Sequence, residues 1–327
     1  MQEEIVNLSD NYDTALVTGG AGFIGSHIID QLLDYGIKVI CVDDLVAGKI
    51  ENIQHHLKDE NFCFEQKDIS DFDKIEHLFK NVDLVFHEAA SKNTVCMKDP
   101  KRDLVVNALG TLNVLEASKK YNVSKFVHAS TGSVYGEPFI FPTDELHPRI
   151  PRSFYGISKT AGESCAKLYS DIYDMNITIL RYFHVYGPRQ NNEFPWGGVV
   201  PIFISQLYYG QTPVIFGDGE QVRSFTYVKD VVAQNMLVIT KESSMGEIYN
   251  CASGIQISIL DLLKRISDIM KVEVKPEFRE TRTGDIRNFE VSNKKIMDLG
   301  YKFRYDFDEG LKETIEWYRD MFKTRGR

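Results

Sequence analysis

The chain has 327 residues, 43% of them hydrophobic, which is long enough for two lobes that each bury a core. Its formal net charge of −9 disfavours a general nucleic-acid-binding surface, so any anionic ligand must be met by individual arginines. No apolar run approaches the ~18 residues of a membrane span and no signal peptide is recognisable, so we expect a cytoplasmic protein without membrane contact.

From Thr14 onward, apolar runs of strand length alternate with amphipathic segments of helix length. Strands are predicted at 14–18, 38–42, 61–66, 82–87, 125–130 and 177–183. Helices are predicted at 22–35, 72–79, 100–121 and 154–173. Six or seven strands separated by helices indicate an α/β fold with a doubly wound parallel sheet of the Rossmann type.

The pattern changes after Tyr186, where the Pro/Gly/Asn-rich segment 187–198 leads into short strands and helices. We therefore predict a first domain over 1–185 and a smaller C-terminal α/β substrate-binding domain over 186–327. Regular segments near 224–252 predict that the chain returns there to the first domain.

A glycine-rich turn stands between the first predicted strand and helix. Its G-x-x-G-x-x-G pattern lets the backbone approach a pyrophosphate at the helix N-terminus, although close helix packing is an alternative explanation. Asp43, which ends the second strand, can accept hydrogen bonds from ribose hydroxyls and would repel a 2′-phosphate, so NAD is favoured over NADP. The predicted cofactor-binding residues in this part of the chain are Gly19, Gly22, Phe23, Ile24, Gly25, Asp43, Asp68 and Ile69.

Some polar residues near strand ends keep structural alternatives. Asp68 and Ile69 follow the third strand, where an adenine edge could be bound, but Asp68 is equally suited to a turn. His87 and Glu88 lack a third ligand at metal-binding spacing, so we interpret them as strand-end residues beside the cofactor. The five cysteines form no C-x-x-C pair. We therefore expect buried thiols in a reducing cytosol and no metal site.

Tyr155 and Lys159 lie four residues apart in a predicted helix and therefore share one face. An ammonium beside a phenol favours the ionised phenol, and a group that titrates near ~10 becomes a usable base. Amphipathic helices supply such pairs by chance, so the spacing gains its weight from the glycine-rich turn upstream.

Taken in order, the motifs resemble the extended short-chain dehydrogenase/reductase family, and most closely its nucleotide-sugar epimerase/dehydratase group and the UDP-glucose (UDP-hexose) 4-epimerases. The motifs are GGAGFIGS, VDD, KDI, HEAA, VVNALGT, HASTGSVYG, YGISK and LRYFHVYGPRQ, and the likeness runs from about Thr14 to about Tyr301. The resemblance implies a Rossmann-type NAD domain, a lobe that closes over a nucleotide-diphosphate sugar, and a homodimer packed through two long helices.

The resemblance also implies a catalytic triad of Thr131, Tyr155 and Lys159. In it, Thr131 would bridge the substrate hydroxyl and Tyr155, and Lys159 would bind the nicotinamide ribose. Asn107 occupies the place of a helix asparagine that supports the active-site backbone, the alternative being a solvent-facing residue. Lys92 stands where 4-epimerases of UDP-galactose and UDP-glucose carry a lysine at the cofactor and substrate, the alternative being a surface lysine.

The two residues after Thr131 bear on the reaction. In this family the tyrosinate takes a proton from the sugar O4 while NAD takes hydride from C4. The dehydratase relatives carry carboxyl groups just after the hydroxyl residue, and the decarboxylase relatives commonly keep one. Gly132 and Ser133 cannot move a proton in that way at neutral pH. We therefore expect 4-epimerisation, in which the ketone turns in the pocket and hydride returns to its other face.

The resemblance implies diphosphate contacts at Arg223 and Arg282, whose guanidinium groups suit phosphate oxygens. A bulky Phe289 beside the sugar C2 favours an unacetylated hexose. His184 departs from the Asn of many epimerases, and it would favour a uronate if it were protonated. Counting Phe216 as a stacking partner for uracil, the predicted substrate-binding residues are Lys92, Thr131, Ser133, Tyr155, His184, Phe216, Arg223, Arg282 and Phe289.

Other functions stay open. The segment STGSVYG also resembles UDP-glucuronate 4-epimerases, in which hydroxyls hold the sugar carboxylate. A nucleotide-sugar dehydratase, a simple dehydrogenase that releases NADH and an NAD-binding protein without activity are the remaining alternatives.

Overall fold

The computed structural model describes residues 8–91, 99–192, 197–281 and 289–325, which fall into two compact units. Among these residues, no helix is both long enough and apolar enough to cross a bilayer. The chain returns to unit 1 over residues 232–249, inside the predicted range 224–252, and the main change of unit falls after residue 181 instead of 185. Residues 137–148 differ from the prediction, because they group with unit 2. Unit 1 comprises Met1–Gly136, Arg149–Arg181 and Val232–Tyr249, and unit 2 comprises Glu137–Pro148, Tyr182–Val231 and Asn250–Arg327.

Unit 1 is built on a seven-stranded sheet. Its strands are β1 (Thr14–Thr18), β2 (Lys38–Asp43), β3 (Phe62–Gln66), β4 (Leu84–His87), β5 (Lys125–Thr131), β6 (Ile177–Tyr182) and β11 (Ile248–Cys251). They lie in the order β11-β6-β5-β4-β1-β2-β3, and the β1–β2, β2–β3, β1–β4 and β4–β5 pairs are parallel. The strand order reverses between β1 and β4, where open α/β sheets form a crevice for ligands. The predicted doubly wound sheet is confirmed.

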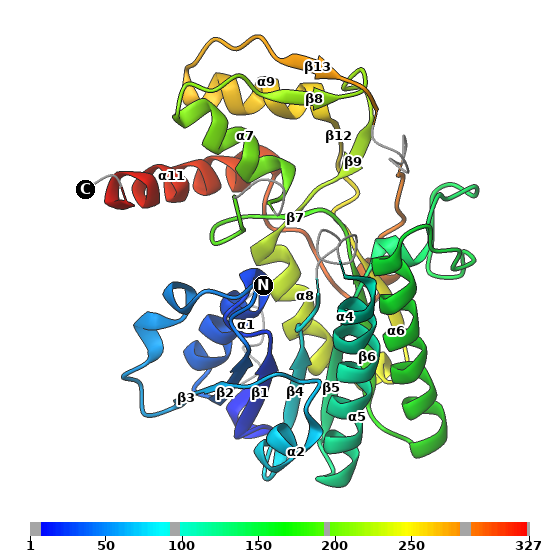
Figure 1. Ribbon diagram of the computed structural model, residues 1–327. Helices are drawn as coiled ribbons and strands as arrows, with labels where there is room; N and C mark the ends of the chain where they lie inside the picture. The colour runs from blue at the N-terminus through cyan, green and yellow to red at the C-terminus, as the bar shows by residue number, and fades with distance from the viewer. Residues whose placement is uncertain (1–7, 92–98, 193–196, 282–288, 326–327) are drawn as a thin grey trace. The chain divides into compact units, whose positions relative to one another are not determined.

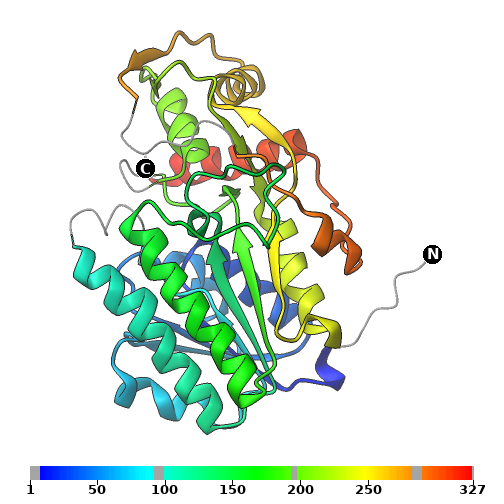
Figure 2. The ribbon, with the colours of Figure 1, turned by 90° about the vertical axis from the view of Figure 1, so that its right-hand side faces the viewer.

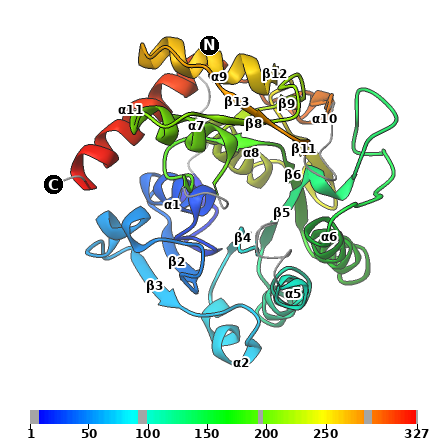
Figure 3. The same ribbon diagram turned by 45° about the horizontal axis from the view of Figure 1, so that its top comes forward.

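Helices cover both faces of this sheet. One face carries α1 (Phe23–Asp34) and α8 (Val228–Ile239), and the other carries α2 (Phe72–Ile75), α5 (Thr111–Lys120) and α6 (Phe154–Tyr173) (Figures 1 and 3). In Figure 2, α5 and α6 run side by side in front of the sheet. The core between sheet and helices is apolar, with Leu16, Val85, Phe126 and Ile179 among its buried members.

The helix predicted over 100–121 changes its geometry in the middle. α4 (Pro100–Leu104) passes into a π-helical segment (Val105–Gly110) that continues as α5. π-helical turns inside α-helices are rare and frequently lie at functional sites. In the same way, α2 is followed by the 3₁₀ turn η4 (Glu76–Phe79) within the helix predicted at 72–79.

Unit 2 contains small two-stranded sheets and the helices that pack on them. Its described helices are α7 (Val199–Tyr208), α9 (Ile259–Met270), α10 (Lys294–Asp298) and α11 (Phe307–Arg325). Its strands pair as β7 (Val185–Tyr186) with β10 (Thr226–Tyr227), β9 (Val222–Ser224) with β12 (Gln256–Ser258), and β8 (Val214–Phe216) with β13 (Glu277–Arg279). Aromatic side chains fill its interior, where Tyr186 packs against Phe307 and Phe225.

Candidate active site

The glycine-rich turn after β1 requires glycine because other backbone atoms lie against it. Gly19 has a φ of +67°, and a Cβ there would lie 2.6 Å from the backbone nitrogen of Ala89. A Cβ on Gly25 would lie 2.4 Å from the carbonyl oxygen of Gly19. The turn leads into α1, and no side chain caps its first N–H groups at Gly22. Such a helix N-terminus suits an anionic group such as a pyrophosphate.

Asp43 lies beside this turn at the end of β2. Its Oδ2 accepts a hydrogen bond from the Ala21 backbone N–H at 3.0 Å, and its Oδ1 accepts one from the Leu45 N–H at 2.8 Å. Burial raises the pKa of this carboxyl to about 6, against the lowering effect of both hydrogen bonds. Asp43 therefore carries a charge at pH 7, and its remaining lone pairs can accept hydrogen bonds from ribose hydroxyls. The turn and Asp43 together fit an NAD-type dinucleotide.

Asp68 lies in a turn and also contacts α4 through Arg102. Its Oδ1 accepts hydrogen bonds from the backbone N–H and hydroxyl of Ser70, and its Oδ2 accepts one from Arg102 at 2.6 Å. Burial works to raise the pKa of Asp68, but the bonds from Ser70 and Arg102 outweigh it and lower the pKa. These contacts match the turn alternative. The neighbouring Ile69 is buried, and its carbonyl accepts a hydrogen bond from Asn113 at 3.0 Å.

Thr131, Tyr155 and Lys159 lie at the junction of β5 and α6. Thr131 ends β5 and begins the 3₁₀ turn η6 (Gly132–Val134), where its hydroxyl accepts a hydrogen bond from the Ser133 N–H at 3.2 Å. Ser153 caps α6 through the Gly156 N–H, which fixes the first turn that carries Tyr155. The Lys159 ammonium donates to the Ala129 carbonyl at 2.6 Å. Lys159 thus ties α6 to β5 two residues before Thr131.

Lys159 is a buried cation with a shifted pKa. Only 2% of its surface is exposed, and burial lowers its pKa to about 8, although Glu88, Glu163 and Asp103 act in the opposite direction. The neighbouring His87 lies between the hydroxyls of Thr18 and Thr111 at 2.7 and 2.9 Å. Burial and Lys159 lower the pKa of His87 to about 3, so its imidazole is neutral. His87 is therefore a packed, neutral strand-end residue within reach of the Lys159 charge.

Asn107 is buried in the π-helical segment, which excludes the solvent-facing alternative. Its Oδ1 accepts a hydrogen bond from the Ser91 N–H at 2.8 Å. Its Nδ2 donates to Asp103 at 3.1 Å and to Ser158 at 3.0 Å. Ser158 also donates to Asp103 at 2.6 Å. This network joins the loop after β4, the π-helical segment and the turn of α6 next to Lys159.

Two members of that network, Asp103 and Ser158, were not identified from the sequence. Asp103 lies four residues before Asn107, so the two side chains share a helix face, and Ser158 directly precedes Lys159. Burial raises the pKa of Asp103, with the hydrogen bond from Ser158 and the charge of Lys159 acting against the shift. The carboxyl is well placed to fix the start of α6.

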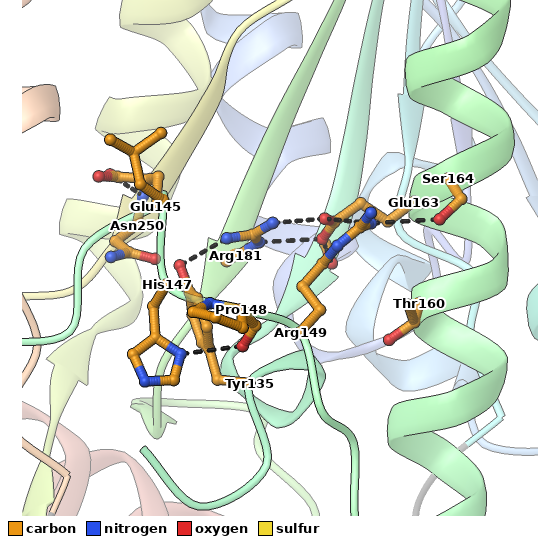
Figure 4. A network of polar contacts seen from close by, with 12 residues as sticks. Tyr135, Glu145, His147, Pro148, Arg149, Thr160, Glu163, Ser164, Arg181 and Asn250 are labelled. Atoms are coloured by element: carbon orange, nitrogen blue, oxygen red, sulfur yellow. Dashed lines mark hydrogen bonds and ion pairs between the residues drawn. The ribbon is translucent and has the colours of Figure 1, made fainter. Parts of the chain in front are cut away.

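A buried ion pair was also missed. The guanidinium of Arg181, 2% exposed, contacts both carboxylate oxygens of Glu163, with Nε at 3.0 Å and Nη2 at 2.6 Å (Figure 4). Glu163 further accepts hydrogen bonds from Ser130 at 2.5 Å and Arg149 at 3.1 Å. Arg181 donates to the Tyr135 hydroxyl at 2.6 Å. The pair joins α6 to β6 and to both sides of η6. One indication of this ion pair lies in the sequence, because Glu163 and Arg181 carry opposite charges inside otherwise apolar segments.

The predicted substrate residues of unit 2 are Arg223, His184, Phe216 and Phe289. Arg223 and Phe216 are half-buried on β9 and β8. Phe289 is buried, with its ring centroid 5.3 Å from that of Phe183. His184 is exposed as a whole residue, while burial of its ring and the Arg223 charge lower the pKa of the imidazole, so it is neutral at pH 7.

Two predicted residues, Lys92 and Arg282, lie outside the described residues. The positions of both therefore stay predictions from the sequence.

The chain matches the model of one protein family, the NAD dependent epimerase/dehydratase family, over residues 15–252. A putative UDP-glucose 4-epimerase of Methanocaldococcus jannaschii is 40% identical over 315 residues, which cover 94% of this chain and 99% of that protein. The match therefore spans nearly the whole of both chains.

Solved structures agree with this match. The UDP-glucose 4-epimerase of Thermotoga maritima with UDP-glucose has a TM-score of 0.89 and 38% identity, covering 94% of this chain and 99% of that one. The UDP-N-acetylglucosamine 4-epimerase of Methanobrevibacter ruminantium, in complex with UDP-N-acetylmuramic acid, has a TM-score of 0.90 and 35% identity, with 95% and 99% covered. Matches of lower identity include a UDP-glucuronic acid 4-epimerase crystallised with NAD, and several 4,6-dehydratases.

Proposed function

The chain belongs to the NAD dependent epimerase/dehydratase family, and from this membership we propose that it is an NAD-dependent 4-epimerase of a UDP-hexose, of the UDP-glucose and UDP-galactose type. The proposal rests on the identity of the residues in the turn η6. Thr131 ends β5 beside α6, and the next two residues, Gly132 and Ser133, bring no carboxyl group. The site therefore has a base for oxidising a sugar alcohol but lacks an acid-base pair there for eliminating water.

The glycine-rich turn and Asp43 hold the cofactor in this proposal. A Cβ at Gly25 would fill the space that the backbone needs, and Asp43 offers a charged acceptor beside the turn. NAD bound there would supply the oxidant that removes hydride from the sugar C4 and gives it back.

Tyr155 is the proposed base and later the proposed acid at the sugar O4. Lys159, fixed by the Ala129 carbonyl, places a buried positive charge near the phenol and favours its ionised form. Thr131 holds the substrate hydroxyl and the phenol in line by hydrogen bonds. Asn107 and Asp103 support the α6 turn that presents Lys159. Because the proton returns to the same oxygen, the residues end the cycle in their starting state.

Unit 2 supplies the proposed contacts to the nucleotide sugar. Arg223 meets the diphosphate and Phe216 stacks on the uracil, with Arg282 and, from the first domain, Lys92 as further contacts predicted from the sequence. A neutral His184 donates one hydrogen bond and brings no charge to attract a uronate. Phe289 adds bulk where an N-acetyl group would stand. These features favour a neutral, unacetylated hexose.

The main alternative is a UDP-glucuronate 4-epimerase of the same mechanism, which the hydroxyls of Thr131 and Ser133 support. Purified protein would be incubated separately with UDP-galactose, UDP-glucuronate and UDP-N-acetylglucosamine, and the products identified by proton NMR. We expect interconversion of UDP-galactose and UDP-glucose. Faster turnover of another of these sugars would show that the substrate assignment is wrong. A 4-keto-6-deoxy product would indicate a dehydratase, and accumulation of NADH would indicate a dehydrogenase. The absence of any turnover would contradict the proposal.

We also propose a homodimer packed through α6 and the long helical segment that comprises α4, the π-helical segment and α5. The exposed surface of α6 bears an apolar stripe, and α4 and the π-helical segment add Leu104 and Leu109. The stripe consists of Phe154, Ile157, Leu168 and Ile172, which recur at helical spacing. A second copy of the same helix pair would cover it with two-fold symmetry. Light scattering should give the mass of a dimer, and Leu168→Glu should give that of a monomer. A monomeric wild-type protein would contradict the proposal.

A further inference from the structure

Three side chains of unit 1 that the proposed reaction does not use converge on one point. Asp30 lies in α1, while His55 and His56 end the 3₁₀ turn η3 (Gln54–His56). The Nε2 atoms of His55 and His56 lie 3.1 and 2.8 Å from the same oxygen, Oδ1 of Asp30. Across the described ranges, this is the one group of three or more His, Cys, Asp or Glu whose possible ligand atoms all lie within 4.8 Å of one another.

These distances are close to those of ligands around one small metal ion. Zn²⁺ binds imidazole nitrogen and carboxylate oxygen at ~2.0–2.2 Å, so two ligand atoms of a tetrahedral ion lie about 3.3 Å apart. Shifts of a few tenths of an ångström would bring both nitrogens to that separation from Oδ1.

The two imidazoles differ in their freedom to make this adjustment. The side chain of His55 is 46% exposed, and that of His56 is 16% exposed. The ring of His56 packs 5.7 Å from Phe62 and 4.0 Å from the His55 ring, centroid to centroid. One ligand is thus held in place while the other can turn toward an ion.

We propose that Asp30, His55 and His56 bind a divalent transition-metal ion of the zinc class. Two imidazoles and one carboxylate suit Zn²⁺, Co²⁺ or Ni²⁺, whereas Mg²⁺ and Ca²⁺ prefer sites made of oxygen ligands. Water completes the coordination on the solvent side. Without an ion, each Nε2 donates its proton to the Asp30 carboxylate. When the ion binds, that proton leaves Nε2 and each ring carries its single proton on Nδ1, so that the Nε2 lone pair faces the ion. The Asp30 carboxylate balances half of the charge of the ion.

The ion would act as a clip on the loop that follows Asp43. Within that loop, the Lys49 N–H and the Asn52 Nδ2 both donate to the Ala21 carbonyl at 2.9 Å, which attaches it to the glycine-rich turn. The proposed metal would attach η3, a few residues on, to the middle of α1. Both attachments restrain the loop next to the proposed cofactor site, and metal binding is thereby coupled to the stability of unit 1.

Metal titration of the full-length chain tests the site. The protein carries no affinity tag, is freed of metal with EDTA, and has Cys63→Ser. Contrary to the buried thiols expected from the sequence, Cys63 is an exposed free thiol that could itself bind zinc. Zn²⁺ is titrated in competition with a chromophoric chelator, and Co²⁺ is followed by its visible absorption. We expect one Zn²⁺ per chain, a visible Co²⁺ band and a higher melting temperature with Zn²⁺.

Variants separate this site from non-specific binding. His56→Ala and Asp30→Asn should each weaken Zn²⁺ binding by at least about tenfold and abolish the thermal shift. His77→Ala removes another exposed imidazole and should change neither. Circular dichroism of the metal-free variants verifies that they fold. Zn²⁺ affinity that is equal in the parent and in folded His56→Ala, or no saturable binding by the parent, would overturn the proposal and leave a histidine–carboxylate hydrogen-bond cluster.

Discussion

Replacing Glu163 by glutamine should strongly destabilise unit 1. In the wild-type chain, both carboxylate oxygens accept hydrogen bonds from Arg181, whose guanidinium is 2% exposed. In Glu163→Gln, one oxygen becomes an NH₂ group that faces N–H donors, and Arg181 loses the countercharge that compensates its burial. The bonds from Ser130 and Arg149 to the same carboxylate are disturbed as well.

The expected loss is about 3 kcal/mol of unfolding free energy, the lower end of the ~3–5 kcal/mol found when one partner of a buried pair is removed. The lower end applies because the Tyr135 hydroxyl and ring also contact the guanidinium. Arg149→Gln is the matched control. Arg149 is 36% exposed, so its loss should cost about 1 kcal/mol or less. The double variant Glu163→Leu/Arg181→Met removes both charges and should recover most of the loss.

The pair should also leave a mark on the acid stability of the chain. Burial works to raise the pKa of Glu163, but Arg181, Ser130 and Arg149 outweigh it and lower the pKa. A carboxyl with a lowered pKa in the folded state contributes stability that is present above its unfolded pKa and is lost as pH falls through the folded value. Glu163→Gln should therefore flatten the loss of stability below about pH 4.

Urea unfolding followed by far-UV circular dichroism measures these differences, and hydrogen exchange of β5 and β6 amides assigns them to unit 1. Two results would refute the reasoning. One is a Glu163→Gln variant whose unfolding free energy lies within about 1 kcal/mol of the wild-type value, which is the range expected for the control Arg149→Gln. The other is a double variant as unstable as Glu163→Gln alone.

Further variants test the cofactor turn, the supporting network and a buried lysine. Gly25→Ala places a Cβ 2.4 Å from the Gly19 carbonyl oxygen and should weaken NAD binding, measured by calorimetry, at least about tenfold. The control is Gly36→Ala, at a position with a φ of +75° and open space around it. This control should cost about 1 kcal/mol of stability and leave the NAD affinity unchanged. Asp103→Asn removes a charge that raises the pKa of Lys159, so the basic limb of the kcat profile should move to lower pH, and an unmoved limb would contradict the network. Burial lowers the pKa of Lys125 from 10.5 to about 7, so the unfolded chain binds more protons above pH 7 and stability should rise between about pH 7 and 10. Lys125→Met should flatten part of that rise in melting temperature, and identical pH profiles would contradict this.

The elements of unit 1 could be predicted because their patterns are local. The segment 154–173 is amphipathic and follows Ser153, which caps it, and the structure has α6 over the same residues. β1 likewise matches the apolar run 14–18. Periodicity and capping depend on neighbouring residues alone, so they can be recognised without knowing the tertiary fold.

The π-helical segment and the buried pairs could not be predicted in the same way. Nothing in VVNALG distinguishes a π turn from an α-helix, and the geometry is accompanied by contacts of Asn107 with Ser91 and Ser158, which are distant in sequence. The partners of Glu163 on β5 and β6 become known only once the strands are placed. Asp30 and His56 are likewise in contact although a long loop separates them in the sequence. The expectation of no metal site was based on the sequence spacing of possible ligands, which cannot detect contacts between residues so far apart in the chain.

The most direct test of the proposed reaction uses UDP-galactose with deuterium at C4, incubated with the purified protein and NAD. The proposed mechanism predicts UDP-glucose that keeps the deuterium at C4, because the hydride is lent to the cofactor and returned to the same carbon. Tyr155→Phe should form this product at least about 100-fold more slowly. Loss of the label from C4, or wild-type rates in Tyr155→Phe, would contradict the proposed mechanism.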